Sequence, residues 1–299
     1  MLVRAKAPVR IDFGGAWTDV DRYALSRGGV VFNATIAHHV EGTFKVHESG
    51  DGAESREGLD VRYGFDLPSG SGLGTSAALN VVWFGLLNRR VDTDADRIRV
   101  AEQAYGLEGL LGILGGRQDQ YASALGGFNR MRFGETVDVE RIHIPSATVT
   151  ALEERSVLAY TGKPRLSGAI HENVWGAFDA GRTSTVRALD RLREIGDAMP
   201  EILSAGDIDA FARLLAENWD CQRQLDDSVT NQDIERMFAD AGAAGAVGGK
   251  ACGAGGGGCL YFVTAPGRAS AVAQALSAAG VQVIPFTFAS DGLTVTREA

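Results

Sequence analysis

In the first half of the chain, hydrophobic and polar residues alternate in some segments with the two-residue period of strands and in others with the 3.6-residue period of helices. Alternation predicts strands, and the polar stretch HESGDGAESREG, residues 47–58, predicts a turn between the second and third of them. A helical period then appears twice, with Thr93 and Asp94 as capping candidates for the second helix. We expect strands at 2–13, 29–47, 59–65, 128–133 and 136–144, and helices at 76–90 and 92–111.

The pattern restarts near residue 150. A strand is expected at SVLAYTG, long helical patterns fill about 167–242, and a glycine cluster occupies 248–258. A strand at CLYFVTA, a helix at 267–279 and a strand at VQVIPFTF follow. The sequence therefore predicts two α+β domains, residues 1–150 and 151–299.

Composition narrows the class of protein. Of the 299 residues, 45% are hydrophobic and 22% are charged, which is typical of a globular protein with a sizeable core. The net charge of -9 argues against a nucleic-acid partner, because phosphate binding needs a concentrated basic surface. The three cysteines form no CxxC pair, so neither a disulfide framework nor a zinc site is expected. Without a signal-peptide pattern or an apolar stretch of roughly 20 residues, we expect a cytoplasmic protein with no membrane partner.

The stretch PSGSGLGTSAA, residues 68–78, is a candidate anion site. Glycine-rich turns that lead into a helix expose backbone N–H groups at the positive end of the helix dipole, and their usual ligand is phosphate. The stretch is neither a Walker P-loop, since no lysine follows Gly74, nor a dinucleotide GxGxxG, since Thr75 replaces the required glycine or alanine. The GxGxxG at 253–258 leads into a strand, which excludes a Rossmann interpretation there. The alternative for 68–78 is a tight turn before a core helix.

Two hydroxyls and two carboxylates extend this hypothesis. Thr75 and Ser76 stand where a hydroxyl can hold Mg²⁺ against nucleotide phosphates. Glu108 falls on the apolar face of its predicted helix, so it needs either a cationic side chain or a metal as its partner. Asp119, amid glycines in GGRQDQ, is either a loop-capping aspartate or a catalytic base.

Three motifs, in order, resemble the signature regions of the GHMP kinases, the family of galactokinase, homoserine kinase, mevalonate kinase and phosphomevalonate kinase. They are APVRIDFGGAWTD at the start, PSGSGLGTSAA in the middle and GGKACGAGGGGCL near the end. The segments GGRQDQYASALGGFN, YTGKPR, ENWDCQRQL and VTNQDIERM are similar to the sugar-kinase branch that acts on heptose phosphates. The resemblance covers nearly the whole chain. It implies the two-domain α+β GHMP kinase fold, with a ribosomal-protein-S5-domain-2-like N-terminal domain and a ferredoxin-like C-terminal domain.

The resemblance also implies the chemistry: an ATP- and Mg²⁺-dependent kinase that phosphorylates a hydroxyl, the anomeric one, of a sugar or sugar phosphate such as a heptose 7-phosphate. Asp119 would orient or deprotonate that hydroxyl with Arg10 beside it, and Asp19 would hydrogen-bond the substrate. Ser76 and Glu108 would hold Mg²⁺. The other implied contacts are to the nucleotide, from Pro68, Gly70, Ser71, Gly72, Leu73, Gly74, Thr75, Ser76, Ala77, Gly255, Gly256 and Gly257, and to the substrate, from Gly15, Trp17, Thr18, Arg117, Gln118, Tyr121 and Arg165.

Some positions depart from the family or leave alternatives open. Ala16 and Trp17 stand where galactokinases carry glutamate and histidine, so galactose is not the expected substrate. Trp17 is either a stacking platform for a sugar or a core residue. The basic residues of GGRQDQ and YTGKPR, which are Arg117, Lys163 and Arg165, are either surface residues or a site for a phosphate already on the substrate.

Other functions also stay open at this point. One is a mevalonate-type or other small-alcohol kinase, and another is a non-catalytic regulator that binds a sugar or ATP. The segment between His47 and Pro68 is shorter than in the family, which predicts either different contacts to the purine, a preference for another nucleotide or a mobile edge. The five histidines show no triad or metal spacing and are expected on the surface or in packing. A monomer or a homodimer is expected.

Overall fold

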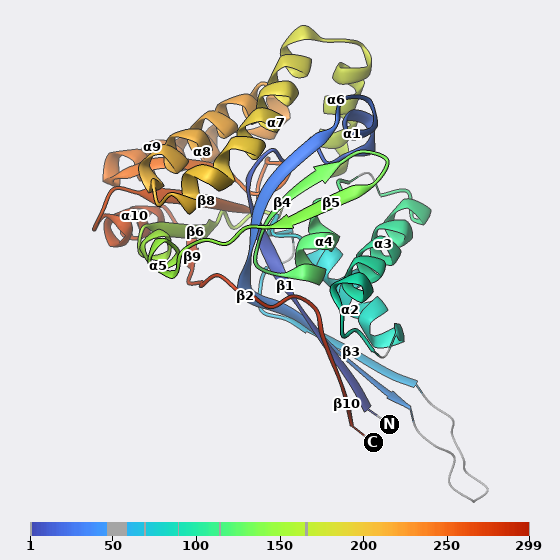
Figure 1. Cartoon of the computed structure of the whole chain (residues 1–299). Coiled ribbons are helices and arrows are strands. Elements are labelled where there is room, and N and C mark those ends of the chain that lie inside the picture. Colours follow the sequence, from blue (N-terminus) through green and yellow to red (C-terminus); the bar gives the residue numbers. More distant parts are fainter. Residues whose placement is uncertain are drawn as a thin grey trace, which may run out of the picture.

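The structure is a computed structural model, and it describes residues 2–46, 59–68, 70–88, 90–113, 115–164 and 167–298. The polar turn expected at 47–58 lies outside these residues, and so does Arg165, an expected substrate contact. Two antiparallel sheets and the helices that cover them make up the described fold (Figure 1).

The first sheet has six strands in the order β10-β1-β2-β4-β5, and β3 also pairs with β2. Strand β1 alternates between exposed and buried residues at its start and is buried throughout from Ala7 onward, where helices of both halves of the chain pack on it. The bounds are β1 Leu2–Gly14, β2 Gly29–Val46, β3 Leu59–Phe65, β4 Phe128–Phe133, β5 Val137–Arg141 and β10 Thr294–Glu298.

Four helices belong to the first half: α1 Asp21–Arg27, α2 Thr75–Asn88, α3 Asp94–Leu110 and α4 Gln118–Leu125. Helices α2 and α4 pack on β1, and α3 packs on both of them (Figure 1). Helix α3 begins at a capping box in which Thr93 and Asp96 each bond the other's backbone N–H, so the predicted cap at Thr93 is confirmed.

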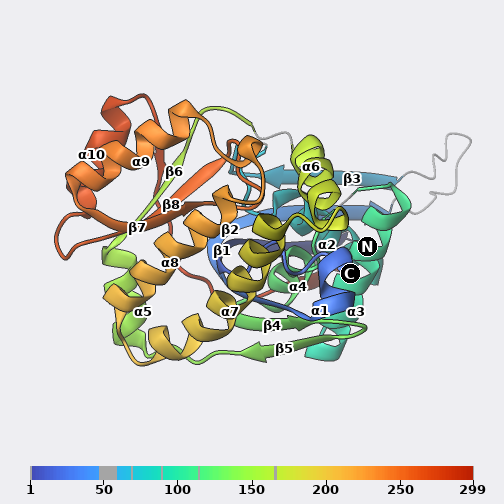
Figure 2. The ribbon, with the colours of Figure 1, turned by 90° about the horizontal axis from the view of Figure 1, so that it is seen from above.

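The second half builds a four-stranded sheet in the order β7-β8-β6-β9, covered by helices (Figure 2). The strands are β6 Ser156–Tyr160, β7 Ala246–Ala251, β8 Cys259–Thr264 and β9 Gln282–Ile284. The helices are α5 Ser146–Glu154, α6 Ser167–Asp179, α7 Thr183–Ser204, α8 Ile208–Arg223, α9 Gln232–Ala244 and α10 Ala269–Ala278, with a short 3₁₀ turn at Asp227–Val229. None of the described helices is long and apolar enough to cross a membrane.

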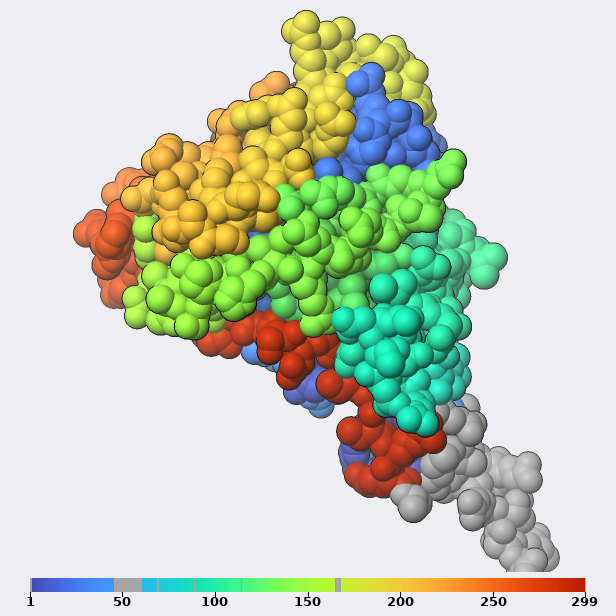
Figure 3. Space-filling view, viewed as in Figure 1, coloured from blue at the N-terminus to red at the C-terminus, as the bar shows by residue number. Residues whose placement is uncertain are grey.

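An aromatic cluster fixes the two halves together. The ring of Phe13 on β1 lies 5.5 Å from that of Phe32 in the first half. It also lies 5.2 Å from the ring of Phe211 and 5.5 Å from that of Tyr261 in the second half. All four side chains are buried, so this contact excludes water from the junction. In the space-filling view the two halves accordingly form one continuous surface (Figure 3).

The structure corrects several details of the predicted elements. Residues 118–125 form helix α4, so Asp119 lies in the first turn of a helix and not in a glycine loop. Strand β7 runs into the predicted glycine cluster, and α1, α5 and β10 were not predicted. Strand β10 adds residues 294–298 to the first sheet, while the division into domains at residue 150 stays a prediction.

Candidate active site

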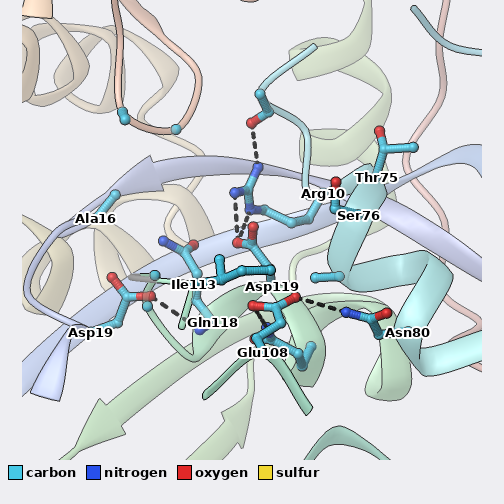
Figure 4. Close-up of a pocket in the computed structure, with 18 of the residues that line it drawn as sticks. Arg10, Ala16, Asp19, Thr75, Ser76, Asn80, Glu108, Ile113, Gln118 and Asp119 are labelled. Atoms are coloured by element: carbon cyan, nitrogen blue, oxygen red, sulfur yellow. Dashed lines mark hydrogen bonds and ion pairs between the residues drawn. The ribbon is translucent and has the colours of Figure 1, made fainter. Parts of the chain in front are cut away.

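A cavity of about 480 Å³ opens where β1, the starts of α2 and α4 and the end of α3 meet the loop after β7. Asp119 lies in the middle of its labelled residues in Figure 4, with Asp19 to one side and Thr75 and Ser76 to the other. The lining residues of the cavity come from all three sequence motifs.

The glycine loop before α2 forms one wall. Gly70, Gly72 and Gly74 have φ of 70°, 81° and 78°, which side-chain-bearing residues rarely adopt. A Cβ on Gly72 would lie 2.6 Å from the carbonyl oxygen of Cys252, so this loop packs tightly against the loop after β7. Because α2 begins at Thr75, the N–H groups of its first turn have no partner within the helix and can bind an anion.

Arg10 and Asp119 form an ion pair beside that loop. The Arg10 guanidinium donates from Nε to Asp119 Oδ1 at 2.8 Å, and its Nη2 lies 2.6 Å from the same oxygen. Its Nη1 donates to the carbonyl oxygen of Gly72 at 2.7 Å. Burial lowers the pKa of Arg10, but the charges of Asp119 and Asp12 outweigh it and raise the pKa above its ordinary value. Arg10 therefore stays a cation held in one orientation.

Glu108 is a second carboxylate on the cavity wall, 7% exposed. Burial, together with the charge of Asp119, raises its pKa to about 7. One oxygen accepts a hydrogen bond from the side-chain amide of Asn80 at 3.0 Å (Figure 4), and the other accepts one from the side-chain amide of Gln120 at 2.8 Å. No cationic side chain pairs with Glu108 among the described residues. This carboxylate would therefore gain from a bound cation.

Asp19 is a third carboxylate, on the opposite side of Asp119 from the glycine loop (Figure 4). The backbone N–H of Gln118 donates to its Oδ2 at 3.1 Å. Burial raises the pKa of Asp19 to about 6, despite this hydrogen bond. A Cβ on Gly116 would lie 1.8 Å from the same oxygen, so only glycine leaves room for the carboxylate there.

Trp17 lines the cavity with a φ of 82°, a conformation that non-glycine residues rarely adopt. Its ring centre lies 4.6 Å from that of His171 on α6, which also lines the cavity. The indole N–H of Trp17 is buried without a hydrogen-bond partner among the described residues. An aromatic wall of this kind can pack against the face of a sugar ring.

The structure brings together most of the predicted site. The predicted residues that line the cavity are Arg10, Trp17, Asp19, Gly70, Ser71, Gly72, Gly74, Thr75, Ser76, Ala77, Glu108, Gln118 and Asp119. Those placed off its wall are Gly15, Thr18, Pro68, Leu73, Arg117, Tyr121, Gly255, Gly256 and Gly257.

The residues off the wall have other contacts. The Thr18 hydroxyl bonds backbone groups of Gly15 and Val30, and the Tyr121 hydroxyl donates to Glu102 at 2.8 Å. Arg117 pairs with Asp21 at 2.6 Å. In the third motif, Gly253 and Ala254 line the cavity, whereas Gly255 and Gly256 pack near Val229.

Several residues that line the cavity could not be predicted from the sequence. Asn80 and Gln120 are ordinary polar residues in the sequence, and only the packing of α2 and α4 beside α3 brings them to Glu108. His171, expected on the surface or in packing, packs against Trp17 and also lines the cavity. Its position at the cavity could not be predicted from the sequence, because α6 reaches the cavity from the other half of the chain.

Comparison with known proteins shows the family of the chain. Two family models match in order: GHMP kinases N terminal domain at residues 36–127 and GHMP kinases C terminal at residues 187–282. D-glycero-alpha-D-manno-heptose 7-phosphate kinase from Campylobacter jejuni is 29% identical, with 99% of each chain covered. A mevalonate kinase from Pyrococcus abyssi is 26% identical over 81% of this chain and 70% of its own. A solved D-glycero-D-manno-heptose 1-phosphate kinase from Bacteroides thetaiotaomicron is 25% identical, with a TM-score of 0.78 over 99% of both chains.

Fold, cavity and matches agree on the class of protein, an ATP-dependent kinase of small molecules. The chain belongs to the GHMP kinase family. The predictions of the GHMP kinase fold and of an ATP-dependent sugar kinase are thereby confirmed.

Proposed function

We propose that the chain transfers the terminal phosphoryl group of ATP, with Mg²⁺, to the anomeric hydroxyl of a sugar phosphate such as a heptose 7-phosphate. The observation that carries the proposal is the position of Asp119, between the glycine loop and Asp19 (Figure 4). A carboxylate at this point can face both a nucleotide phosphate bound at the loop and a hydroxyl of the acceptor.

Asp119 is suited to act as the base. Both contacts from Arg10 are made to its Oδ1, which leaves Oδ2 for the acceptor hydroxyl. Oδ2 lies 3.2 Å from the place that a Cβ on Gly74 would occupy, so it is adjacent to the loop. Phosphoryl transfer asks a protein mainly for positioning and charge stabilisation, and Arg10 supplies a fixed cation next to the base.

The nucleotide side consists of the glycine loop and the start of α2. The N–H groups of the first helical turn would bind the phosphates, and the Ser76 hydroxyl, exposed at the cavity, would face them. Glu108 fits a magnesium ligand, because it is a buried carboxylate with no cationic side chain beside it among the described residues. Mg²⁺ bound there would neutralise charge on the phosphates, and it commonly takes only one or two protein carboxylates.

The acceptor side consists of Asp19, Trp17 and Gln118. Asp19 would accept hydrogen bonds from sugar hydroxyls, and Trp17 would pack on the ring. The relative from Campylobacter jejuni, named as a heptose 7-phosphate kinase, supports a phosphorylated acceptor. Arg117 and Lys163, however, pair with Asp21 and Asp233 at 2.6 Å each, so a role for them in binding a distal phosphate stays a prediction.

Substrate profiling tests the proposal. ADP release would be followed with ATP, Mg²⁺ and a heptose 7-phosphate, the same heptose without phosphate, galactose and mevalonate. We expect the heptose 7-phosphate to give the highest kcat/KM, with ³¹P NMR placing the new phosphate on the anomeric oxygen. A preference for mevalonate would favour the small-alcohol kinases. Binding of ATP and sugar without turnover would favour a regulator.

Asp119→Asn tests the base. Because asparagine keeps the shape but cannot take the proton, kcat should fall on the order of 10²–10⁴-fold, the usual contribution of a general base. The Kd of ATP should stay within about threefold, since the phosphates are held by backbone groups. Asp138→Asn, on an exposed strand, is the matched control. Wild-type turnover by Asp119→Asn would refute the assignment.

A further inference from the structure

A buried ion pair lies directly behind the proposed site. Asp12 on β1 and Lys250 on β7 are both 0% exposed, although they are 238 residues apart in the chain. The Lys250 ammonium pairs with Asp12 Oδ2 and donates to the backbone oxygen of Asp12 at 2.9 Å. Neither side chain lines the cavity, so neither would touch the substrates.

Asp12 also contacts two groups that do line the cavity. Its Oδ1 accepts a hydrogen bond from the backbone N–H of Gly253 at 3.0 Å. The same oxygen lies 3.9 Å from Nη1 of Arg10, which is two residues away on the same face of β1. Asp119, Arg10, Asp12 and Lys250 therefore form a row of alternating charges whose sum is zero.

This row connects the three sequence motifs. Arg10 and Asp12 come from the first motif, the Gly72 carbonyl that Arg10 bonds comes from the second, and Lys250 and Gly253 come from the third. A buried ion pair is rarely more stabilising than an apolar pair of the same volume, because both charges lose their hydration. Stability alone therefore gives no reason for a charged pair at this position.

The charge of Lys250 bears directly on Arg10. While Lys250 neutralises Asp12, the Arg10 guanidinium is free to direct Nε and Nη2 to Asp119. Without that ammonium, Asp12 would be a buried carboxylate with Arg10 as the next cation, 3.9 Å away. A guanidinium drawn towards Asp12 would turn away from Asp119 and from the Gly72 carbonyl.

We infer that Asp12 and Lys250 are positioning residues, which hold the Arg10 guanidinium on Asp119 and fix the Gly253 wall of the cavity. The expected effect of these two residues on turnover rests on the proposed function. Their effect on the orientation of Arg10 is a property of the protein alone.

Lys250→Met removes the charge and keeps a side chain of similar length. We expect kcat to fall about 30- to 100-fold while the Kd of ATP stays within about threefold, the split expected when positioning rather than binding is lost. Asp12→Asn/Lys250→Met removes both charges and keeps the Oδ1 acceptor for Gly253. This double variant should recover at least tenfold in kcat over the single one. Lys6→Met, which removes a lysine from an exposed ion pair on β1, the strand of Asp12, is the matched control.

The Arg10 Nε–H resonance provides a readout without turnover. In the wild type this proton should exchange slowly with solvent, because the buried Arg10 Nε–H donates to Asp119. Its resonance is identified by the change that Asp119→Asn causes. Exchange should be at least tenfold faster in Lys250→Met and slow again in the double variant. If Lys250→Met does not fold, Lys250→Gln takes its place.

A folded single variant with wild-type kcat and wild-type exchange would overturn the inference. So would a folded double variant that is as slow in turnover and as fast in exchange as the single one, since that result means lost packing and not unbalanced charge. Absence of turnover in the wild type would count against the proposed function and leave the exchange test intact.

Discussion

Asp19 lies in a buried site that disfavours its ionised carboxylate. The substitution Asp19→Asn measures how much this charge lowers the free energy of unfolding. The side chain is 2% exposed, and its pKa rises from the ordinary 3.8 to about 6, chiefly through burial. Asparagine has nearly the same shape and can still accept the Gln118 N–H through its oxygen. The substitution therefore removes the charge and keeps the packing.

The size and sign of the effect follow from linkage. A tenfold change in proton affinity corresponds to about 1.4 kcal/mol. The rise in the pKa of Asp19 is about two pH units, so the ionised carboxylate lowers the free energy of unfolding by about 3 kcal/mol. Between about pH 4 and pH 6 the folded chain binds the proton more tightly than the unfolded chain does. The contribution of Asp19 to stability therefore falls as the pH rises through this window and stays low above it.

Urea unfolding of wild type and Asp19→Asn at several values between pH 4 and pH 8 tests this. The two should have similar stability near pH 4, and the variant should become more stable by up to about 3 kcal/mol at pH 7 and above. At the same time kcat/KM should fall about 10- to 100-fold, because a charge-assisted hydrogen bond to the acceptor is lost. Asp138→Asn, which removes an exposed carboxylate, is the control. A difference between wild type and Asp19→Asn that does not vary with pH would refute the reasoning.

Two further substitutions test the walls of the cavity. Gly72→Ala should lower the free energy of unfolding by about 1–3 kcal/mol and weaken ATP binding, because its Cβ would lie 2.6 Å from the Cys252 carbonyl oxygen at a φ of 81°. Thermal unfolding with and without ATP measures both effects, and Gly109→Ala, with nothing within 4 Å of its Cβ, should show neither. Trp17→Ala should raise the KM of the sugar about tenfold and leave the KM of ATP unchanged, since stacking on one aromatic ring is lost. Steady-state kinetics with each substrate varied in turn would contradict this if both KM values moved together.

Local features of the site could be predicted from the sequence. The glycines of PSGSGLGTSAA indicate positive φ before a helix, and the structure has α2 beginning at Thr75 directly after Gly74. Likewise, the 3.6-residue period of α3 placed Glu108 on its buried face, which the structure confirms. Both features depend on backbone geometry and on residues that are close together in the chain.

Helix α4 shows where local patterns fail. Its N-cap, Arg117, makes no side-chain capping bond, and glycines flank the helix at both ends. Its stability comes from packing on β1 and α3, and nearly all of its residues are buried. Strand β10 depends in the same way on pairing with β1, at the other end of the chain.

The sequence by itself determined the family and the glycine turn before α2, and it proposed Arg10, Asp19, Glu108 and Asp119 as site residues. Their arrangement was decided by tertiary structure alone. Arg10 meets Asp119 across 109 residues of chain, and Asp12 meets Lys250 across 238. The physical reason is that burial and opposite charge act between side chains once the fold has brought them together, and neither leaves a periodic pattern along the chain.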